Sequence, residues 1–214
     1  MKSKDYNESE KLLRNRFYSD NEYDMPLLKK EFIEIKNLEL ISFDNIKLDE
    51  NKNNYKTVHF FLDDYKFENL YSNYEWNVKK LVNYKYIITP DFSVYPNMPL
   101  PVQIFNIFKS RYCGAYWQSL GFNVIPSVTW SDERSFKFCF LGIPKNSCVA
   151  ISTVGNRNKK DINAFMLGYT EMISQIEPEI IICYGKPINR MYDSSGTIIH
   201  CPYRKIPKKY KEAV

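Results

Sequence analysis

Apolar runs typical of β-strands recur through the chain, and each ends in a cluster of polar residues. Four of them are YIITPDFS (86–93), FNVIPSVTWSD (122–132), SCVAISTVG (147–155) and EIIICYGKP (179–187). Helix-like segments at about 101–119 and 159–177 separate these runs, and this alternation predicts parallel strands with right-handed crossovers. The carboxyl ends of parallel strands share one edge, where open α/β sheets and α/β barrels bind ligands. The four polar clusters therefore predict a site at that edge.

The rest of the chain supplies further elements. Strands are expected in LELISFDN (38–45), YKTVHFFLDD (55–64), SFKFCFLG (135–142) and GTIIHCPY (196–203), a helix at 74–83, and one or two short helical pieces within the first 35 residues. We therefore expect an α/β domain at 38–202 with a largely parallel central sheet, open or incomplete barrel-like, and flanking helices. A polar N-terminal helical appendage (1–37) precedes it, and a basic C-terminal tail (203–214) follows it.

The two clear helices have readable faces. In the first, the residues expected to pack on the sheet are Phe105, Phe108, Tyr112, Ala115 and Ser119. Its opposite face is polar and holds Gln103, Asn106, Ser110, Gly114, Trp117 and Gln118, with Arg111 on the flank. In the second, one apolar stripe contains Ile162, Phe165, Met166, Tyr169, Met172, Ile173 and Ile176. Both patterns have the 3.6-residue period of helices with one buried face.

Composition predicts a soluble cytoplasmic protein. Hydrophobic residues make up 44% of the 214 residues, and aromatic residues 16%, which is too much for a disordered chain. No apolar stretch is long enough to span a membrane, and the charged start does not resemble a secretory signal. The five cysteines, without a CxxC pair, are interpreted as buried thiols. With only two histidines, we expect neither a His-rich metal centre nor a Ser-His-Asp relay.

Two aspartates are the candidate catalytic groups, because each directly follows a predicted strand. Asp91 lies in TPDFS and Asp132 in TWSD. Either carboxylate could act as a general acid or base, or could simply close a turn on its own backbone. Two carboxylates without a third acidic or histidine ligand do not predict a metal site.

Other polar and aromatic residues are candidate ligand contacts. Arg111 is isolated in a charge-poor region and could hold an anion, or form a structural ion pair with Asp91 or Asp132. Lys186 is a second candidate anion contact. Trp117, Tyr116 and Trp130 could stack on a base or sugar, although aromatic residues at helix and strand ends more often pack in the core. The remaining candidate ligand contacts are Ser93, Gln118, Ser152, Thr153 and Tyr184.

Neither a GxxxxGK[ST] nor a GxGxxG pattern is present, so dependence on ATP or NAD has no support and any cofactor stays unknown. The tail from Cys201 onward carries five basic residues against one glutamate. A run of this kind is either a solvated terminus or a nucleic-acid contact.

The combination of PDFS, RxxGAYWQ, VIPxVxWxD, GIPKNS and YGKP resembles family 4417 of the domains of unknown function, across about residues 38–200. That family occurs in bacteria, phages and other mobile elements. The resemblance implies no activity, cofactor or residue role. Positions that match the family's motifs are Asp91, Ser93, Arg111, Gly114, Gln118, Trp130, Asp132, Ser152, Thr153, Tyr184, Gly185 and Lys186.

Two functions are consistent with these observations. The first is a mobile-element or phage protein with a nucleotide or nucleic-acid site at the carboxyl ends of the strands. The alternative is a non-catalytic protein that binds or sequesters a host defence or replication component. Whether the chain is an enzyme is left open at this point.

Overall fold

The computed structural model describes residues 17–34, 36, 38–48, 55–156 and 158–203. Its strands are β1 (Leu40–Ser42), β2 (Thr57–His59), β3 (Tyr86–Ile88), β4 (Val124–Ile125), β5 (Cys148–Ser152), β6 (Ile180–Tyr184) and β7 (Thr197–Cys201). Its α-helices are α2 (Asn69–Ser72), α3 (Tyr74–Leu81), α4 (Leu100–Ser119) and α5 (Lys159–Ile176). Short 3₁₀ helices are η1 (Phe43–Leu48), η2 (Asp64–Lys66), η3 (Glu133–Lys137) and η4 (Asn189–Asp193).

All the pairings between named strands are parallel, and neighbours in space follow the order of the chain. One sheet has the order β1-β2-β3-β4 and a second has the order β5-β6-β7. A parallel bridge between Ser127 and Ala150 joins the two. There the N–H of Val128 donates to the carbonyl of Ala150 (2.8 Å), and the N–H of Ala150 donates to the carbonyl of Pro126 (2.9 Å). With this sequential order, right-handed crossovers place the connecting segments on the same face of the array.

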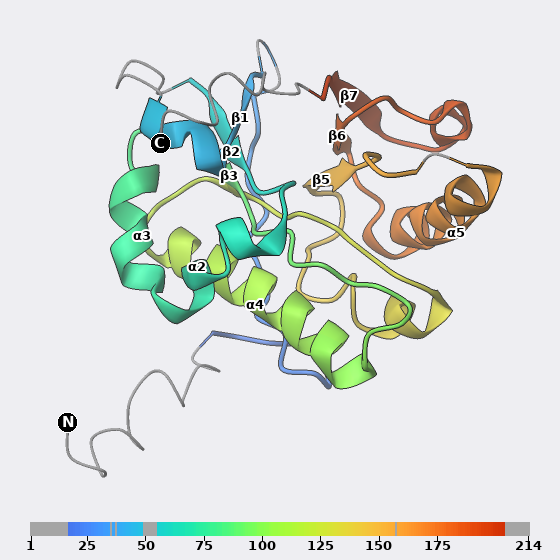
Figure 1. The fold of residues 1–214 in the computed structure, drawn as a ribbon, viewed down its shortest axis with the longest axis horizontal. Coiled ribbons are helices and arrows are strands. Elements are labelled where there is room, and N and C mark those ends of the chain that lie inside the picture. Colours follow the sequence, from blue (N-terminus) through green and yellow to red (C-terminus); the bar gives the residue numbers. More distant parts are fainter. Residues whose placement is uncertain (1–16, 35, 37, 49–54, 157, 204–214) are drawn as a thin grey trace.

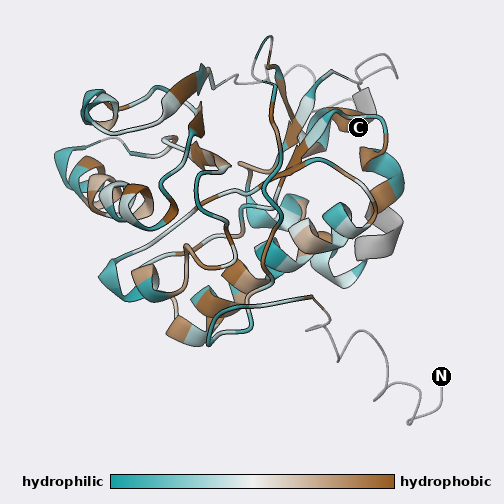
Figure 2. Ribbon diagram, turned by 180° about the vertical axis from the view of Figure 1, so that it is seen from behind, coloured by the Kyte–Doolittle hydropathy of each residue, from teal (hydrophilic) through white to brown (hydrophobic). Residues whose placement is uncertain are grey.

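The helix-covered faces of the two sheets contribute to two different cores. Val58, Ile87 and Val124 belong to a cluster with Tyr112 and Trp117 of α4. A second cluster joins β5 and β6 to α5. Figure 1 shows α2, α3 and α4 grouped with the first sheet and α5 beside the second. Figure 2 shows hydrophilic and hydrophobic residues alternating along the turns of α5, as expected for a helix with one buried face.

The opposite faces of the two sheets pack against each other. Ile88, Ile125, Ala150 and Ile182 form one buried cluster that extends from β3 to β7. On the same face, the ring centroids of His59 in β2 and Tyr184 in β6 lie 4.5 Å apart. The array therefore curls so that its first and second sheets meet, without closing into a barrel. The expected α/β fold with largely parallel strands and flanking helices is confirmed, and the strands, which were expected to form an open or incomplete barrel-like sheet, do not close into a barrel.

The two clear helices occur where the sequence predicts them. Helix α5 begins after Asn158, whose side-chain oxygen accepts a hydrogen bond from the N–H of Asp161 (3.0 Å). It ends at Glu177, which has a left-handed conformation before Pro178. Its predicted apolar stripe contributes Phe165, Met166, Tyr169, Met172 and Ile176 to the core. None of the helices in the described ranges is both long and apolar enough to cross a membrane.

The predicted packing of α4 is right only in part, since Tyr112 and Ala115 are buried as expected. Its polar face is buried, whereas Phe105 is 48% exposed and Ser119 is also exposed. The physical reason is that the polar side chains find hydrogen-bond partners on neighbouring segments. For example, Gln118 accepts from the backbone N–H of Lys29 (2.8 Å) and donates to the carbonyl of the same residue (2.9 Å).

The expectation of a strand at 135–142 is also wrong. The segment 135–142 is not a strand, because Asp132 caps a 3₁₀ helix by accepting from the N–H of Arg134, and the chain then buries Phe138. The predicted N-terminal helical pieces fall partly on residues 1–16, which lie outside the described residues, and the described part of that segment, 17–34, contains no helix. Instead, the side chain of Asn21 accepts from the N–H of Met25 (3.1 Å), which is fully buried in the core. The predicted basic tail lies outside the described residues beyond Tyr203.

Candidate functional site

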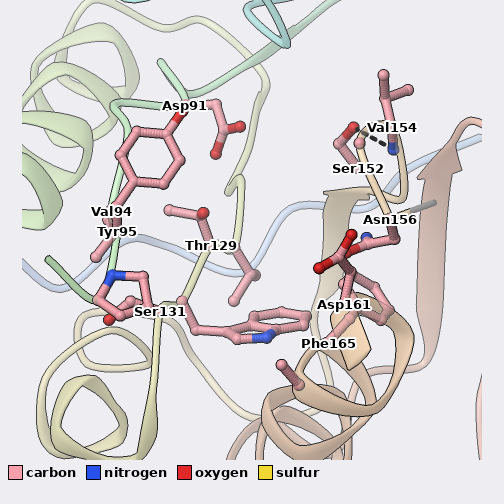
Figure 3. A pocket seen from close by; sticks show the side chains of 15 residues that line it. Asp91, Val94, Tyr95, Thr129, Ser131, Ser152, Val154, Asn156, Asp161 and Phe165 are labelled. Atoms are coloured by element: carbon pink, nitrogen blue, oxygen red, sulfur yellow. Dashed lines mark hydrogen bonds between the residues drawn. The ribbon is translucent and has the colours of Figure 1, made fainter. Parts of the chain in front are cut away.

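A pocket of about 540 Å³ lies at the carboxyl edge of the strands, where the sequence predicts a site. The segments that follow β3, β4 and β5 form its walls together with the first turns of α5 (Figure 3). Its lining includes Asp91, Tyr95, Thr129, Trp130, Ser152 and Asp161. The volume is in the range of ordinary small-ligand sites.

A network of buried hydroxyl groups fixes the end of β3 just before Asp91. The hydroxyl of Thr89 accepts from the backbone N–H of Ser127 (2.8 Å) and from the hydroxyl of Ser110 on α4 (3.1 Å). The next residue but one, Asp91, then points into the pocket (Figure 3). Phe92 is buried on the other side of the chain and anchors the segment.

The Asp91 carboxyl group has an environment that favours its neutral form. Its Oδ1 atom is buried and has no hydrogen-bond partner among the described residues. Burial raises the pKa of Asp91 to about 7, with the nearby Asp64 adding to the rise and Arg111 opposing it. A buried carboxyl group that titrates near neutral pH and borders a pocket is a recognised mark of a functional site.

Ser93 supports this wall and does not line the pocket itself. Its backbone N–H (3.1 Å) and its hydroxyl (2.8 Å) donate to the carboxylate of Asp64 in η2. Its carbonyl accepts from the side chain of Asn106 on α4 (2.6 Å). These contacts hold the loop that carries Asp91 between η2 and α4.

The opposite wall comes from the loop after β5 and from α5. Ser152 lines the pocket, and its hydroxyl accepts from the N–H of Val154 (3.2 Å). Thr153 points away and donates to the carbonyl of Lys186 (3.0 Å). Asp161 faces the pocket from the first turn of α5 (Figure 3). Sequence analysis missed Asp161, although an acidic residue opening the helix after a strand-end loop was an available signal.

Trp130 lines the pocket where β4 leads into η3. Its ring centroid is 5.0 Å from that of Phe165. A Cβ atom at Gly168 would lie only 2.2 Å from the Trp130 ring, so the indole packs directly on the backbone of α5. The tryptophan therefore has both a structural contact and a place in the pocket.

Asp132 does not line the same pocket as Asp91. Its carboxylate is held by Arg134 through hydrogen bonds of 3.1 and 2.7 Å, and the same arginine donates to the carbonyl of Pro96 (2.7 Å). The hydrogen bond from Arg134 lowers the pKa of Asp132. Asp132 lines an adjoining pocket of about 360 Å³, which shares Pro96 and Ser131 with the Asp91 pocket.

Three other predicted contacts lie inside the protein. Arg111 is fully buried and donates to the carbonyls of Leu141 (2.9 Å), Ser127 (3.1 Å) and Cys139 (2.8 Å). Trp117 is 1% exposed, and Gln118 is bound to Lys29 as described above. This placement gives no support to a role for these three residues as ligand contacts.

The remaining candidates, Tyr184 and Lys186, lie at the carboxyl end of β6. Tyr184 stacks with Phe61 at a centroid distance of 5.4 Å and also contacts His59. Lys186 is exposed and is not part of the lining of the Asp91 pocket. Of the predicted site residues, the structure therefore brings together Asp91, Trp130 and Ser152.

The described residues offer few groups suited to metal binding or to thiol chemistry. No group of three histidine, cysteine, aspartate or glutamate side chains is placed to hold a metal ion there. All five cysteines are free and buried, and burial raises the pKa of Cys139 and Cys148 to about 12, which disfavours thiolate nucleophiles. Burial also lowers the pKa of His59 to about 4, so its imidazole is neutral at physiological pH.

Curated relatives of this chain come from mycobacteriophages. The Gene 1 protein of Mycobacterium phage L5 is 45% identical over 130 residues, which make up 60% of this chain and 57% of that protein. The Gene 1 protein of Mycobacterium phage D29 is 41% identical over 130 residues, covering 60% and 48% respectively. The chain spans about half the length of these curated relatives. No solved structure matches it.

A family model described as "Domain of unknown function (DUF4417)" matches residues 17–202. This range contains the pocket, the strand ends that form it and the five motifs that carried the resemblance in the sequence. The chain therefore belongs to the DUF4417 family, which includes phage proteins.

Proposed function

We propose that this protein binds a ligand containing a nucleobase in the Asp91 pocket, and that Asp91 exchanges a proton with that ligand. The observation that carries the proposal is the Asp91 carboxyl group, whose Oδ1 lacks a partner while its pKa is raised to about 7. A general acid or base works best when its pKa lies near the working pH.

The rest of the lining is consistent with a nucleobase. Aromatic side chains of Tyr95, Trp130 and Phe165 border the pocket and offer surfaces on which a planar base can stack. The hydroxyl groups of Thr129 and Ser152 can donate or accept hydrogen bonds toward a base or a sugar. Asp132, bound to Arg134 outside this pocket, is assigned no part in proton exchange.

Equilibrium binding tests the proposal. Isothermal titration calorimetry of the protein with the four ribonucleosides and their 5′-monophosphates is expected to reveal binding of at least one compound. Asp91→Asn should weaken that binding about tenfold or more, since it removes the titrating group but conserves its shape. Asp132→Asn is the matched control and should change the affinity by less than about twofold.

Unfolding curves must show that the Asp91→Asn variant is folded. If the whole panel fails to bind, or if a folded Asp91→Asn variant binds as tightly as the natural protein, the proposal is wrong. The measurement does not depend on knowing a reaction, so it addresses the site before any catalytic assay is available.

Capture of a host protein is a second candidate function, and exposed aromatic side chains favour it. Phe32 is 91% exposed and Tyr65 is 75% exposed, and such residues are frequent anchors of protein interfaces. If this function holds, Phe32→Ser should abolish binding of a host partner while Asp91→Asn leaves it intact. Loss of partner binding in the Asp91 variant alone would contradict it.

A further inference from the structure

The described lining of the Asp91 pocket is acidic. Asp91 and Asp161 face the cavity from opposite walls (Figure 3), and no lysine or arginine is among the described residues that form it. The other polar side chains that line it, including Thr129, Ser152 and Asn156, are uncharged. Phosphate sites, in contrast, are usually built from arginine, lysine and free backbone N–H groups.

Two cations beside the segment that carries Asp91 are already engaged. Arg111 is fully buried, and its Nε, Nη1 and Nη2 atoms donate to three backbone carbonyls. The ammonium group of Lys109 lies 3.9 Å from the ring centroid of Phe92 and interacts with Asp64. Asp64 itself adds negative charge next to Asp91. Neither cation is therefore available to neutralise an anion inside the pocket.

The N-terminus of α5 also borders the pocket, and helix N-termini generally attract anions. Here part of that attraction is already met by groups of the protein. The side chain of Asn158 accepts from the N–H of Asp161 (3.0 Å), and the Asp161 carboxylate itself occupies the first turn. A ligand phosphate at this position would approach a carboxylate and would be repelled by it.

Building on the function proposed above, we propose that the pocket selects an uncharged nucleoside or free base and rejects ligands that carry a phosphate within it. Exocyclic amino groups and ring N–H groups of a base can donate to Asp91 and Asp161, and the hydroxyls of Thr129 and Ser152 can bind a ribose. The chemical class of the ligand thus follows from the charge of the walls.

Paired titrations with adenosine, cytidine and their 5′-monophosphates test this selectivity at low ionic strength. The monophosphate is expected to bind at least about tenfold more weakly than its nucleoside. Added salt should narrow this difference in affinity because it screens the repulsion between the phosphate and the acidic side chains. Asp161→Asn should narrow this difference in affinity by about threefold or more, since it removes the carboxylate that faces the cavity from the first turn of α5.

Glu179→Gln provides a matched control. It makes the same change of charge at the opposite edge of the sheet, just before β6, where Glu179 forms an exposed ion pair with Lys30 (2.8 Å). This variant should leave both affinities unchanged, because an exposed and distant charge is screened by solvent.

The outcomes separate this inference from the function on which it rests. If a monophosphate binds as tightly as its nucleoside, or if Asp161→Asn leaves the difference in affinity unchanged, the selectivity is refuted while an Asp91-dependent site survives. If neither nucleosides nor monophosphates show binding that depends on Asp91, the proposed function fails and the selectivity fails with it.

Discussion

Replacing Asp91 with asparagine should make the protein more stable at neutral and alkaline pH. The fold raises the pKa of Asp91 from its ordinary value of 3.8 to about 7, chiefly through burial. One pKa unit corresponds to about 1.4 kcal/mol, so ionised Asp91 lowers the free energy of unfolding by at most about 4 kcal/mol. Water entering from the pocket will reduce this figure, which is therefore an upper bound.

The pH dependence of this effect has a definite sign. At pH values below 3.8 the carboxyl group is protonated in both the folded and the unfolded chain, so it contributes nothing. Between that value and about 7 the unfolded chain releases the proton while the folded chain keeps it, and stability falls as the pH rises. Above about 7 both forms are ionised and the full cost is present.

Urea unfolding of the natural protein and of Asp91→Asn, from about pH 4.5 to about pH 8, measures this cost directly. The difference in unfolding free energy should grow in favour of the variant by about 1 to 3 kcal/mol across this range. Burying the asparagine amide changes this free-energy difference by the same amount at every pH. The contribution of His59, whose pKa is lowered to about 4, is common to both proteins and cancels.

Asp132→Asn is the control for the same range. Because Arg134 lowers the pKa of Asp132, this carboxylate stabilises the fold when ionised and loses its contribution only as the pH falls through its lowered pKa. The difference between this variant and the natural protein should therefore be flat above about pH 5. A flat difference for Asp91→Asn as well would refute the reasoning that the fold holds Asp91 neutral.

Three further changes test other parts of the structure. Arg111→Met leaves three backbone carbonyls without their donor and should lower the unfolding free energy by about 3 kcal/mol or more in a urea titration. A loss below about 1 kcal/mol would contradict the assigned hydrogen bonds. Gly168→Ala should displace the Trp130 ring, costing about 1–3 kcal/mol and shifting tryptophan fluorescence; an unchanged spectrum would argue against the close packing. If the basic tail binds nucleic acid, truncation after Tyr203 should abolish an affinity that falls steeply with salt, and salt-independent binding would exclude this role.

The sequence contained enough information to predict the sheet, the two long helices and the edge at which the pocket lies. These features depend on local patterns. Apolar runs such as 180–184 bury both faces of a strand, and the stripe from Ile162 to Ile176 repeats with the period of a helix. The position of the pocket then follows from topology, because parallel strands end at a common edge.

The roles of individual polar residues could not be predicted in the same way. On α4 the pattern of apolar residues did not indicate that the polar face is buried too, since Gln118 is buried through a partner 89 residues away in the chain. Arg111, expected to meet an anion, instead binds three backbone carbonyls of distant segments. Only the tertiary structure shows which polar groups are satisfied, because their partners come from other elements.

The same reason separates Asp91 from Asp132, which look alike in the sequence because each follows a strand. Arg134 lies two residues after Asp132 and binds it, whereas Asp91 is placed among buried groups that offer its Oδ1 no partner. The sequence by itself determined a parallel α/β scaffold with polar strand ends. The tertiary structure decided which of those ends keeps an unpaired carboxyl group, because burial and long-range contacts set its charge.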